Sequence, residues 1–214
     1  MSSVIEVKNL SFSYNKLLAL DDISFVVKKS DFIILTGPNG GGKSTLGNLI
    51  YGNLKPTTGI ITKNGTTSLA PQKIIPKQSM PLSVSNFLKY HNNKYPIFQE
   101  LYDAFEIEVI KNQQLIDLSG GWMQKVNLCN AIRLDYDIIL LDEPDQNLDF
   151  QSQEIFYSIL QKIYKKSTFI IISHDIHSFN EGFENAKFFC INQKIHCGTE
   201  FSDVHKMHCH THCN

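Results

Sequence analysis

The amino-acid sequence predicts an α/β fold with a mainly parallel sheet, and two observations lead to this prediction. Short apolar segments at residues 32–36, 138–141 and 168–172 alternate with helical segments, which is typical of a parallel sheet covered by helices. The first segment runs into a glycine-rich stretch at residues 37–42 and then into a helix, as an anion-binding loop requires. The chain has 214 residues, 42% of them hydrophobic, so we expect one domain, residues 1–214, with its own core.

The N-terminal part is rich in β-forming residues. Segments at Ile5–Leu10 and Ile23–Val27 precede the core strand Phe32–Thr36 and predict an N-terminal antiparallel β subdomain. After the glycine-rich stretch, the sequence predicts a helix at Lys43–Tyr51 and two strands around Ile60–Thr62 and Thr67–Ala70.

The middle of the chain changes character after Lys73. Prolines at positions 76, 81 and 96 separate helical segments near Val84–Tyr90 and Ile97–Phe105, and a further helix is expected from Gly121 to about Leu134. We therefore expect residues 73–135 to form a helical subdomain inserted into the α/β core.

The last third returns to alternating strands and helices. A helix near Gln151–Tyr164 separates two buried strands, Ile138–Leu141 and Thr168–Ile172. The final strands are expected at Lys187–Ile191 and Lys194–Cys197, and a polar tail rich in cysteine and histidine, about residues 196–214, closes the chain.

Composition excludes several classes of protein. The net charge of −1 gives no indication of nucleic-acid binding. No apolar run approaches the roughly 20 residues that span a bilayer, and the first residues do not resemble a signal peptide. We therefore expect a cytosolic protein that reaches a membrane only through a partner.

The glycine-rich stretch fits the phosphate-binding pattern G-x-x-x-x-G-K-[ST]. Its glycines let successive N–H groups face phosphate oxygens, Lys43 would reach the β- and γ-phosphates, and Ser44 would coordinate Mg²⁺. A simple glycine-rich turn is the alternative, but the register of the motif disfavours it. The sequence thus predicts the core of a P-loop NTPase, with ATP held by Gly37, Pro38, Asn39, Gly40, Gly41, Gly42, Lys43, Ser44 and Thr45.

Two carboxylates, Asp142 and Glu143, end the predicted strand at 138–141. Ligands bind at the carboxyl edge of open α/β sheets, and adjacent strand residues point to opposite sides, so the two side chains can differ in role. We expect Asp142 to join the Mg²⁺ ligands, and Glu143 to orient the attacking water and accept its proton. The alternative is a strand that simply ends in polar residues.

A Leu-Ser-Gly-Gly segment at 118–121 lies between these two motifs. With this order of motifs, nearly the whole chain resembles the ATP-binding subunits of ABC transporters. The resemblance implies that Ser119, Gly120 and Gly121 act on the nucleotide held by a second copy, since a helix N-terminus favours an anion. It therefore implies a homodimer that encloses two ATP molecules.

The same resemblance assigns roles to further residues. Tyr14 would stack on adenine, with a merely packed tyrosine as the alternative, and Gln72 would contact Mg²⁺ and the attacking water. Asp149 would belong to the loop that crosses the dimer interface, and His174 would bind the γ-phosphate. The residues implied in catalysis are therefore Lys43, Gln72, Glu143 and His174, and those implied in Mg²⁺ binding are Ser44, Gln72 and Asp142.

The sequence departs from the family pattern in three places. Trp122 stands where glutamine is usual after the Leu-Ser-Gly-Gly segment, and Lys125 replaces an arginine of the same helix. Ser30 and Asp31 take the place of the glycine that is usual before the strand leading into the phosphate-binding loop. None of these changes removes an expected phosphate, magnesium or water ligand.

Weaker features point to what is transported. Three segments together resemble the zinc/manganese uptake branch of the family: the sequence of the glycine loop, Met80–Val84 and Cys190–Gly198. Met80–Val84 would receive a helix of the permease, or would be an ordinary helix entry capped by Ser83 or a hydrophobic turn. Thiolates and imidazoles are the ligands that Zn²⁺ prefers, and candidates in the tail are His205, His208, Cys209, His210, His212 and Cys213.

The odd number of cysteines, five, argues against a disulfide framework, so the tail is a candidate zinc site or a chelator without a role. The resemblance implies ATP-driven uptake of zinc or manganese at the cytoplasmic face of the inner (cell) membrane. Its partners would be a permease in the membrane and an extracellular or periplasmic metal-binding protein, with no nucleic acid. Transport of another solute, a soluble ABC ATPase and a cytosolic metal buffer remain alternatives.

Overall fold

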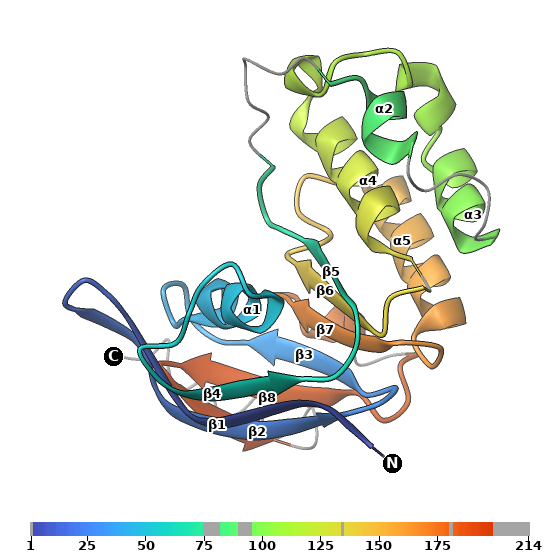
Figure 1. Ribbon diagram of the computed structural model, residues 1–214. Coiled ribbons are helices and arrows are strands. Elements are labelled where there is room, and N and C mark those ends of the chain that lie inside the picture. The colour runs from blue at the N-terminus through green and yellow to red at the C-terminus, as the bar shows by residue number, and fades with distance from the viewer. Residues whose placement is uncertain (1, 75–81, 90–95, 134, 180–181, 199–214) are drawn as a thin grey trace.

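A computed structural model describes the chain except for residues 1, 75–81, 90–95, 134, 180–181 and 199–214. The described residues form two sheets (Figure 1). The larger has six strands in the order β5-β6-β7-β3-β8-β9, parallel except for β9. Its strands are β3 (Phe32–Thr36), β5 (Thr67–Ala70), β6 (Ile138–Asp142), β7 (Thr168–Ile172), β8 (Lys187–Asn192) and β9 (Lys194–Gly198).

The central strands β3, β6 and β7 are buried along their whole length. In β3, Phe32 and Ile34 pack into one hydrophobic cluster, whereas Ile33 and Leu35 pack into another. Because side chains alternate between the faces of a strand, these clusters cover opposite faces of the sheet. This explains why the core strands are continuous apolar runs, and the predicted α/β fold class is confirmed.

The smaller sheet is antiparallel, in the order β2-β1-β4, with β1 at Ser3–Tyr14, β2 at Leu17–Lys28 and β4 at Thr58–Lys63. Strands β1 and β2 extend well beyond the predicted segments. Their pairing contains several register shifts, and Asn9 and Asp22 adopt left-handed backbone conformations near them. Such irregularities interrupt the alternation of apolar and polar residues, so the sequence pattern marks only part of each strand.

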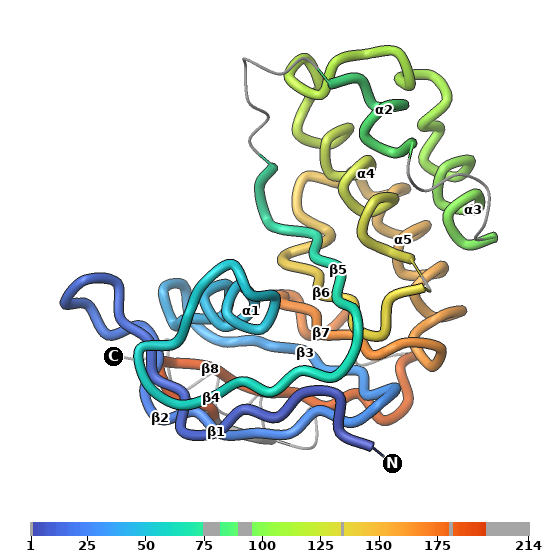
Figure 2. Tube along the Cα trace, in the orientation of Figure 1, coloured from blue at the N-terminus to red at the C-terminus, as the bar shows by residue number. Residues whose placement is uncertain are grey.

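The helices α2 (Val84–Leu88), α3 (Pro96–Ala104) and α4 (Gly120–Ala131) gather at one end of the molecule, away from the antiparallel sheet (Figure 1). Two short 3₁₀ helices at Ile107–Ile110 and Leu115–Asp117 join α3 to α4. Figure 2 shows that the chain enters this helical region after β5 and returns from α4 to β6. Helix α4 ends at Ala131, earlier than predicted, because Ile132 leaves the helical backbone and is fully buried in the core.

Helices α1 (Lys43–Tyr51) and α5 (Phe150–Ile163) complete the α/β core. Within the described ranges, none of the helices is both long and apolar enough to cross a membrane. The register of the parallel strands aligns the carboxyl ends of β3, β6 and β7, since Ile172 of β7 pairs with Leu35 of β3 and with Asp142 of β6. The segments that follow these three strands therefore meet at one edge of the sheet.

Candidate active site

The glycine loop turns tightly between β3 and the N-terminus of α1. Lys43, the first residue of α1, bends back so that its ammonium group donates to the carbonyls of Gly37 and Pro38, both at 2.9 Å. A lysine has three N–H donors, so one remains for a phosphate oxygen. Burial lowers the pKa of Lys43, while the nearby carboxylates of Glu143 and Asp142 oppose this shift.

Several loop glycines are required by neighbouring backbone as well as by a ligand. A Cβ atom on Gly37 or Gly41 would lie 2.1 or 2.6 Å from the carbonyl oxygen of Ile191 in β8. A Cβ atom on Gly42 would meet Leu20 of β2 at 2.5 Å. The loop is therefore packed tightly between β2, which precedes it in sequence, and β8, which follows it. This close packing holds the shape of the loop.

Ser44 and Asp142 come from different elements and meet at the loop. The Ser44 hydroxyl donates to a carboxylate oxygen of Asp142 at 3.1 Å. Burial raises the pKa of Asp142 to about 6, and the hydrogen bond from Ser44 opposes this rise. A hydroxyl and a carboxylate side by side are the oxygen donors that Mg²⁺ takes beside a nucleotide, and a cation there would offset the buried charge. The residues present therefore fit a magnesium ion.

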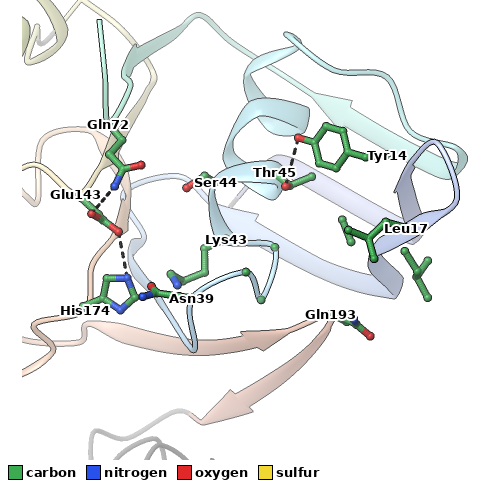
Figure 3. A pocket seen from close by; sticks show the side chains of 15 residues that line it. Tyr14, Leu17, Asn39, Lys43, Ser44, Thr45, Gln72, Glu143, His174 and Gln193 are labelled. Carbon is green, nitrogen blue, oxygen red and sulfur yellow. Dashed lines mark hydrogen bonds and ion pairs between the residues drawn. The ribbon is translucent and has the colours of Figure 1, made fainter.

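Glu143 follows β6 and adopts a left-handed backbone conformation (φ 49°) that turns the chain out of the sheet. Its N–H donates to the Ile172 carbonyl at 2.9 Å, which ties this turn to the end of β7. One carboxylate oxygen accepts a hydrogen bond from Gln72 at 2.7 Å, and the other lies 3.1 Å from Nε2 of His174 (Figure 3). The structure thus brings together three of the four residues predicted for catalysis, and all three face the fourth, Lys43, across the same pocket.

This pocket has a volume of about 400 Å³ and opens to the surface. Tyr14 lies on its far side from Glu143, with its hydroxyl 3.5 Å from that of Thr45 (Figure 3). The Tyr14 ring packs edge-on against Phe12, yet 48% of the residue stays exposed, so a free ring surface faces the pocket. Residues that line the pocket are Tyr14, Leu17, Leu18, Ala19, Asn39, Gly40, Gly41, Gly42, Lys43, Ser44, Thr45, Gln72, Glu143, His174 and Gln193.

Sequence reasoning missed four of these lining residues. Leu17, Leu18 and Ala19 lie at the start of β2, just after the turn from β1. The signal that could have indicated them is the apolar pair Leu17-Leu18 close to Tyr14. Gln193 lies at the turn between β8 and β9, where its N–H donates to the Gly41 carbonyl at 2.9 Å. No sequence signal identifies Gln193, because only the pairing of β3 with β8 brings this turn to the glycine loop.

The Leu-Ser-Gly-Gly segment starts α4, as predicted, with Ser119 as the N-cap that accepts from the N–H of Trp122. Gly120 and Gly121 lie against Asn147 of the same chain. Neither these glycines nor Ser119 line the pocket of their own chain. Asp149 also lies outside it and caps the N-terminus of α5 through the N–H of Ser152 at 2.8 Å.

Trp122 and Lys125, the two residues of α4 that differ from the family pattern, contact each other. The Lys125 ammonium lies 4.8 Å from the centre of the Trp122 ring and 3.5 Å from the Asp149 carboxylate. Trp122 and Lys125 are three residues apart, which places them on one face of the helix. The pair therefore joins the start of α4 to the start of α5.

Two polar residues of α4 fix the helical region to the site. Gln124 is buried and donates to the carbonyl of Pro144 at 2.8 Å, directly after Glu143. Asn127 donates to the carbonyl of Pro71 at 2.9 Å, directly before Gln72. Sequence reasoning did not identify these contacts, because polar residues inside a helix usually face solvent.

The predicted zinc ligands of the tail and Met80 lie outside the described residues. Among the residues that the structure does describe, no group of three His, Cys, Asp or Glu side chains could hold a metal ion.

A glycine loop before a helix, a serine beside a buried aspartate, and a glutamate between a glutamine and a histidine define a P-loop ATPase. Comparison with known proteins extends this class to a family. The family model for the ABC transporter matches residues 20–146. The chain belongs to the ABC transporter family and is an ATPase of that family.

Among the relatives, the zinc import ATP-binding protein ZnuC of Rickettsia conorii is 37% identical over 204 residues, which cover 91% of this chain and 85% of the relative. The protein of the same name from Ehrlichia chaffeensis is 35% identical over 211 residues and covers 95% of this chain and 86% of the relative. A metal-chelate type ABC transporter solved in an inward-facing conformation has a TM-score of 0.75 and 25% identity, with 98% of this chain and 90% of that chain covered.

Proposed function

We propose that this chain is the ATP-hydrolysing subunit of an importer of zinc, or of manganese, working on a membrane permease. The observation that carries the proposal is the Glu143 carboxylate, held between Gln72 and His174 across the pocket from Lys43. The names of the relatives support zinc as the cargo.

The site residues divide the work of hydrolysis. Loop amides and Lys43 bind the β- and γ-phosphates, while Tyr14 and the apolar Leu17 offer surfaces to the base. When bound at Ser44 and Asp142, Mg²⁺ neutralises charge on the phosphates. Glu143 accepts a proton from the attacking water, and Gln72 and His174 orient the carboxylate and the γ-phosphate.

In the isolated chain both oxygens of Glu143 are already bound by Gln72 and His174. Each carboxylate oxygen has a second lone pair, so Glu143 can also accept a hydrogen bond from the attacking water. Gln72 and His174 then hold the carboxylate in place while it binds that water.

We infer that the working unit is a homodimer in which Ser119, Gly120 and Gly121 of one copy complete the site of the other. Their place outside their own pocket supports this arrangement. The partners would be permease subunits and an extracellular or periplasmic metal-binding protein, with the ATPase peripheral on the cytoplasmic face of the membrane. Residues 1–214 form one ABC-type domain in this proposal.

The C-terminal tail is a separate part of the proposal, supported only by its residue types. Its histidines and cysteines would bind zinc on the cytoplasmic side and adjust the ATPase to the metal supply. Truncation after Gly198 should abolish zinc binding measured by calorimetry. Equal zinc binding by the truncated and full-length proteins would refute a role for the tail.

The test of hydrolysis is the isosteric substitution Glu143→Gln. We expect ATP binding to remain within about twofold of wild type and turnover to fall by at least 100-fold, because only the proton-accepting oxygen is lost. Glu154→Gln, on the exposed face of α5, is the matched control and should hydrolyse ATP normally. Turnover by Glu143→Gln near the wild-type rate would overturn the role of Glu143.

The test of cargo is elemental analysis of cells that lack this chain, grown with scarce metal. A selective fall in zinc or manganese, restored by wild type but not by Glu143→Gln, is the expected result. Unchanged metal content in cells without another importer would refute metal uptake and favour a different solute.

A further inference from the structure

One hydrogen-bond network beside the site has no part in the roles assigned above. Tyr157, in the middle of α5, donates its hydroxyl to a carboxylate oxygen of Asp145 at 2.9 Å. Gln153, one turn earlier on the same face, donates to the Asp145 carbonyl at 3.3 Å. Helix α5 therefore holds Asp145 through both its side chain and its backbone.

Asp145 follows Glu143 by two residues, so its placement bears on the carboxylate that activates water. Asp145 also accepts the N–H of Leu148 at 3.2 Å, which closes a tight turn after β6. Burial raises the pKa of Asp145, and the hydrogen bond from Tyr157 opposes this rise. Tyr157 thus stabilises a half-buried carboxylate that would otherwise lack a side-chain donor from α5.

The other side of the Tyr157 ring contacts the segment that follows His174. Phe179, in the 3₁₀ helix at His177–Phe179, packs edge-on against Tyr157 with ring centres 5.3 Å apart. The same short helix is capped by Asp175, which accepts the N–H of His177 at 3.1 Å and the hydroxyl of Ser178 at 2.5 Å. Tyr157 is therefore a common contact for the turn after Glu143 and the turn after His174.

A cleft of about 290 Å³ lies between these two turns, and its lining includes Glu143 and Asp145 on one side and His174 and Asp175 on the other. Pairing of β6 with β7 and the hydrogen bond from Glu143 to Ile172 hold the starts of the two turns together. Further along the turns, Tyr157 adds a second link, binding one by its hydroxyl and the other by its ring.

We propose that Tyr157 is a positioning residue for hydrolysis, which sets the spacing of Glu143 and His174 through Asp145 and Phe179. This inference rests on the proposed role of Glu143 as the proton acceptor. A small displacement of a catalytic group lowers the rate of hydrolysis more than the affinity for ATP, because many other contacts also bind the nucleotide.

The experiment is Tyr157→Phe, which removes the hydroxyl and keeps the ring. We expect kcat for ATP hydrolysis to fall about tenfold while KM and the melting temperature stay close to wild type. Tyr102→Phe is the matched control, because Tyr102 donates to Glu108 at the same distance of 2.9 Å in the helical region, far from the pocket. This control should leave kcat unchanged.

A double-mutant cycle with Asp145→Asn identifies the route. If Tyr157 acts through Asp145, the double variant should be no slower than the slower single variant. Three results would overturn the proposal. Tyr157→Phe could keep the wild-type kcat, or could lose ATP affinity or melting temperature together with kcat. The effects of the two substitutions on kcat could also multiply in the double variant. Failure of the proposed function is seen separately, as unimpaired turnover by Glu143→Gln.

Discussion

At the scale of single residues, the site is built from charges that its environment disfavours. Asp142 is 5% exposed and carries a pKa raised by burial, and Lys43 is buried beside it with a lowered pKa. Both shifts lie in the direction that desolvation imposes on an ionised group. The apo site therefore has a free-energy cost at neutral pH that a bound nucleotide and cation would relieve.

This cost can be measured with Asp142→Asn in the absence of Mg²⁺. The aspartate pKa rises from 3.8 in the unfolded chain to about 6 in the folded chain, so above pH 6 the folded state carries a cost of roughly 2–3 kcal/mol. Asparagine removes that cost and should increase the free energy of unfolding at pH 7.5 by about this amount.

The sign of the pH dependence follows from the same shift. Between about pH 4 and pH 6, the folded state binds a proton that the unfolded state has released, so wild-type stability falls as pH rises. The difference between the variant and wild type should therefore narrow as pH falls from 6 to 4 in urea unfolding experiments. A difference that is constant with pH would contradict the raised pKa.

At the scale of elements, close backbone packing fixes the glycine loop. Strand β8 approaches the loop so closely that Gly37 and Gly41 have no room for a side chain. The turn after β8 adds a hydrogen bond from Gln193 to Gly41. The last parallel strand thus shapes the phosphate site although it contributes no predicted ligand.

Gly41→Ala tests this packing. A Cβ atom 2.6 Å from the Ile191 carbonyl oxygen must displace the loop, so we expect at least a tenfold loss of ATP affinity, measured with a fluorescent analogue. Gly52→Ala is the control, since Gly52 has open space and only a left-handed backbone (φ +105°). It should cost about 1–2 kcal/mol of stability and leave ATP affinity unchanged.

At the scale of the whole molecule, the helical region carries the Leu-Ser-Gly-Gly segment outside its own pocket. Gln124 and Asn127 of α4 bind the backbone next to Glu143 and next to Gln72, so movement of this region reaches both residues. In the proposed homodimer, a second copy of the chain places this segment against a nucleotide.

Gly120→Asp tests the need for a second copy. A Cβ atom at this position has room, 3.8 Å from Asn147, so the variant should fold, but a carboxylate there would repel the γ-phosphate of the partner's ATP. In the Glu143→Gln background we expect unchanged ATP binding and loss of the ATP-dependent dimer in gel filtration. Ser85→Asp, at the exposed start of α2, is the control. A dimer that persists in Gly120→Asp would contradict the arrangement.

The sequence by itself determined the core strands, helix α1 and the motif positions. Buried parallel strands are continuous apolar runs, and β3, β5 and β7 have the predicted bounds because nothing irregular interrupts them. Most residues of the candidate site were also accessible, since Gly37, Asp142 and His174 lie at or just after the carboxyl ends of strands that meet at one edge.

Only the tertiary structure decided the contacts between segments far apart in the chain. Three such contacts depend on which strands pair and which helices cover them. They are the close approach of β8 to Gly41, the hydrogen bond from Gln124 of α4 to Pro144, and the contacts of Tyr157 with Asp145 and Phe179. Local patterns report the periodicity of one segment and contain no information on its neighbours in space. For this reason the sequence identified most of the residues that line the pocket, whereas the structure was needed to find the residues that hold them in place.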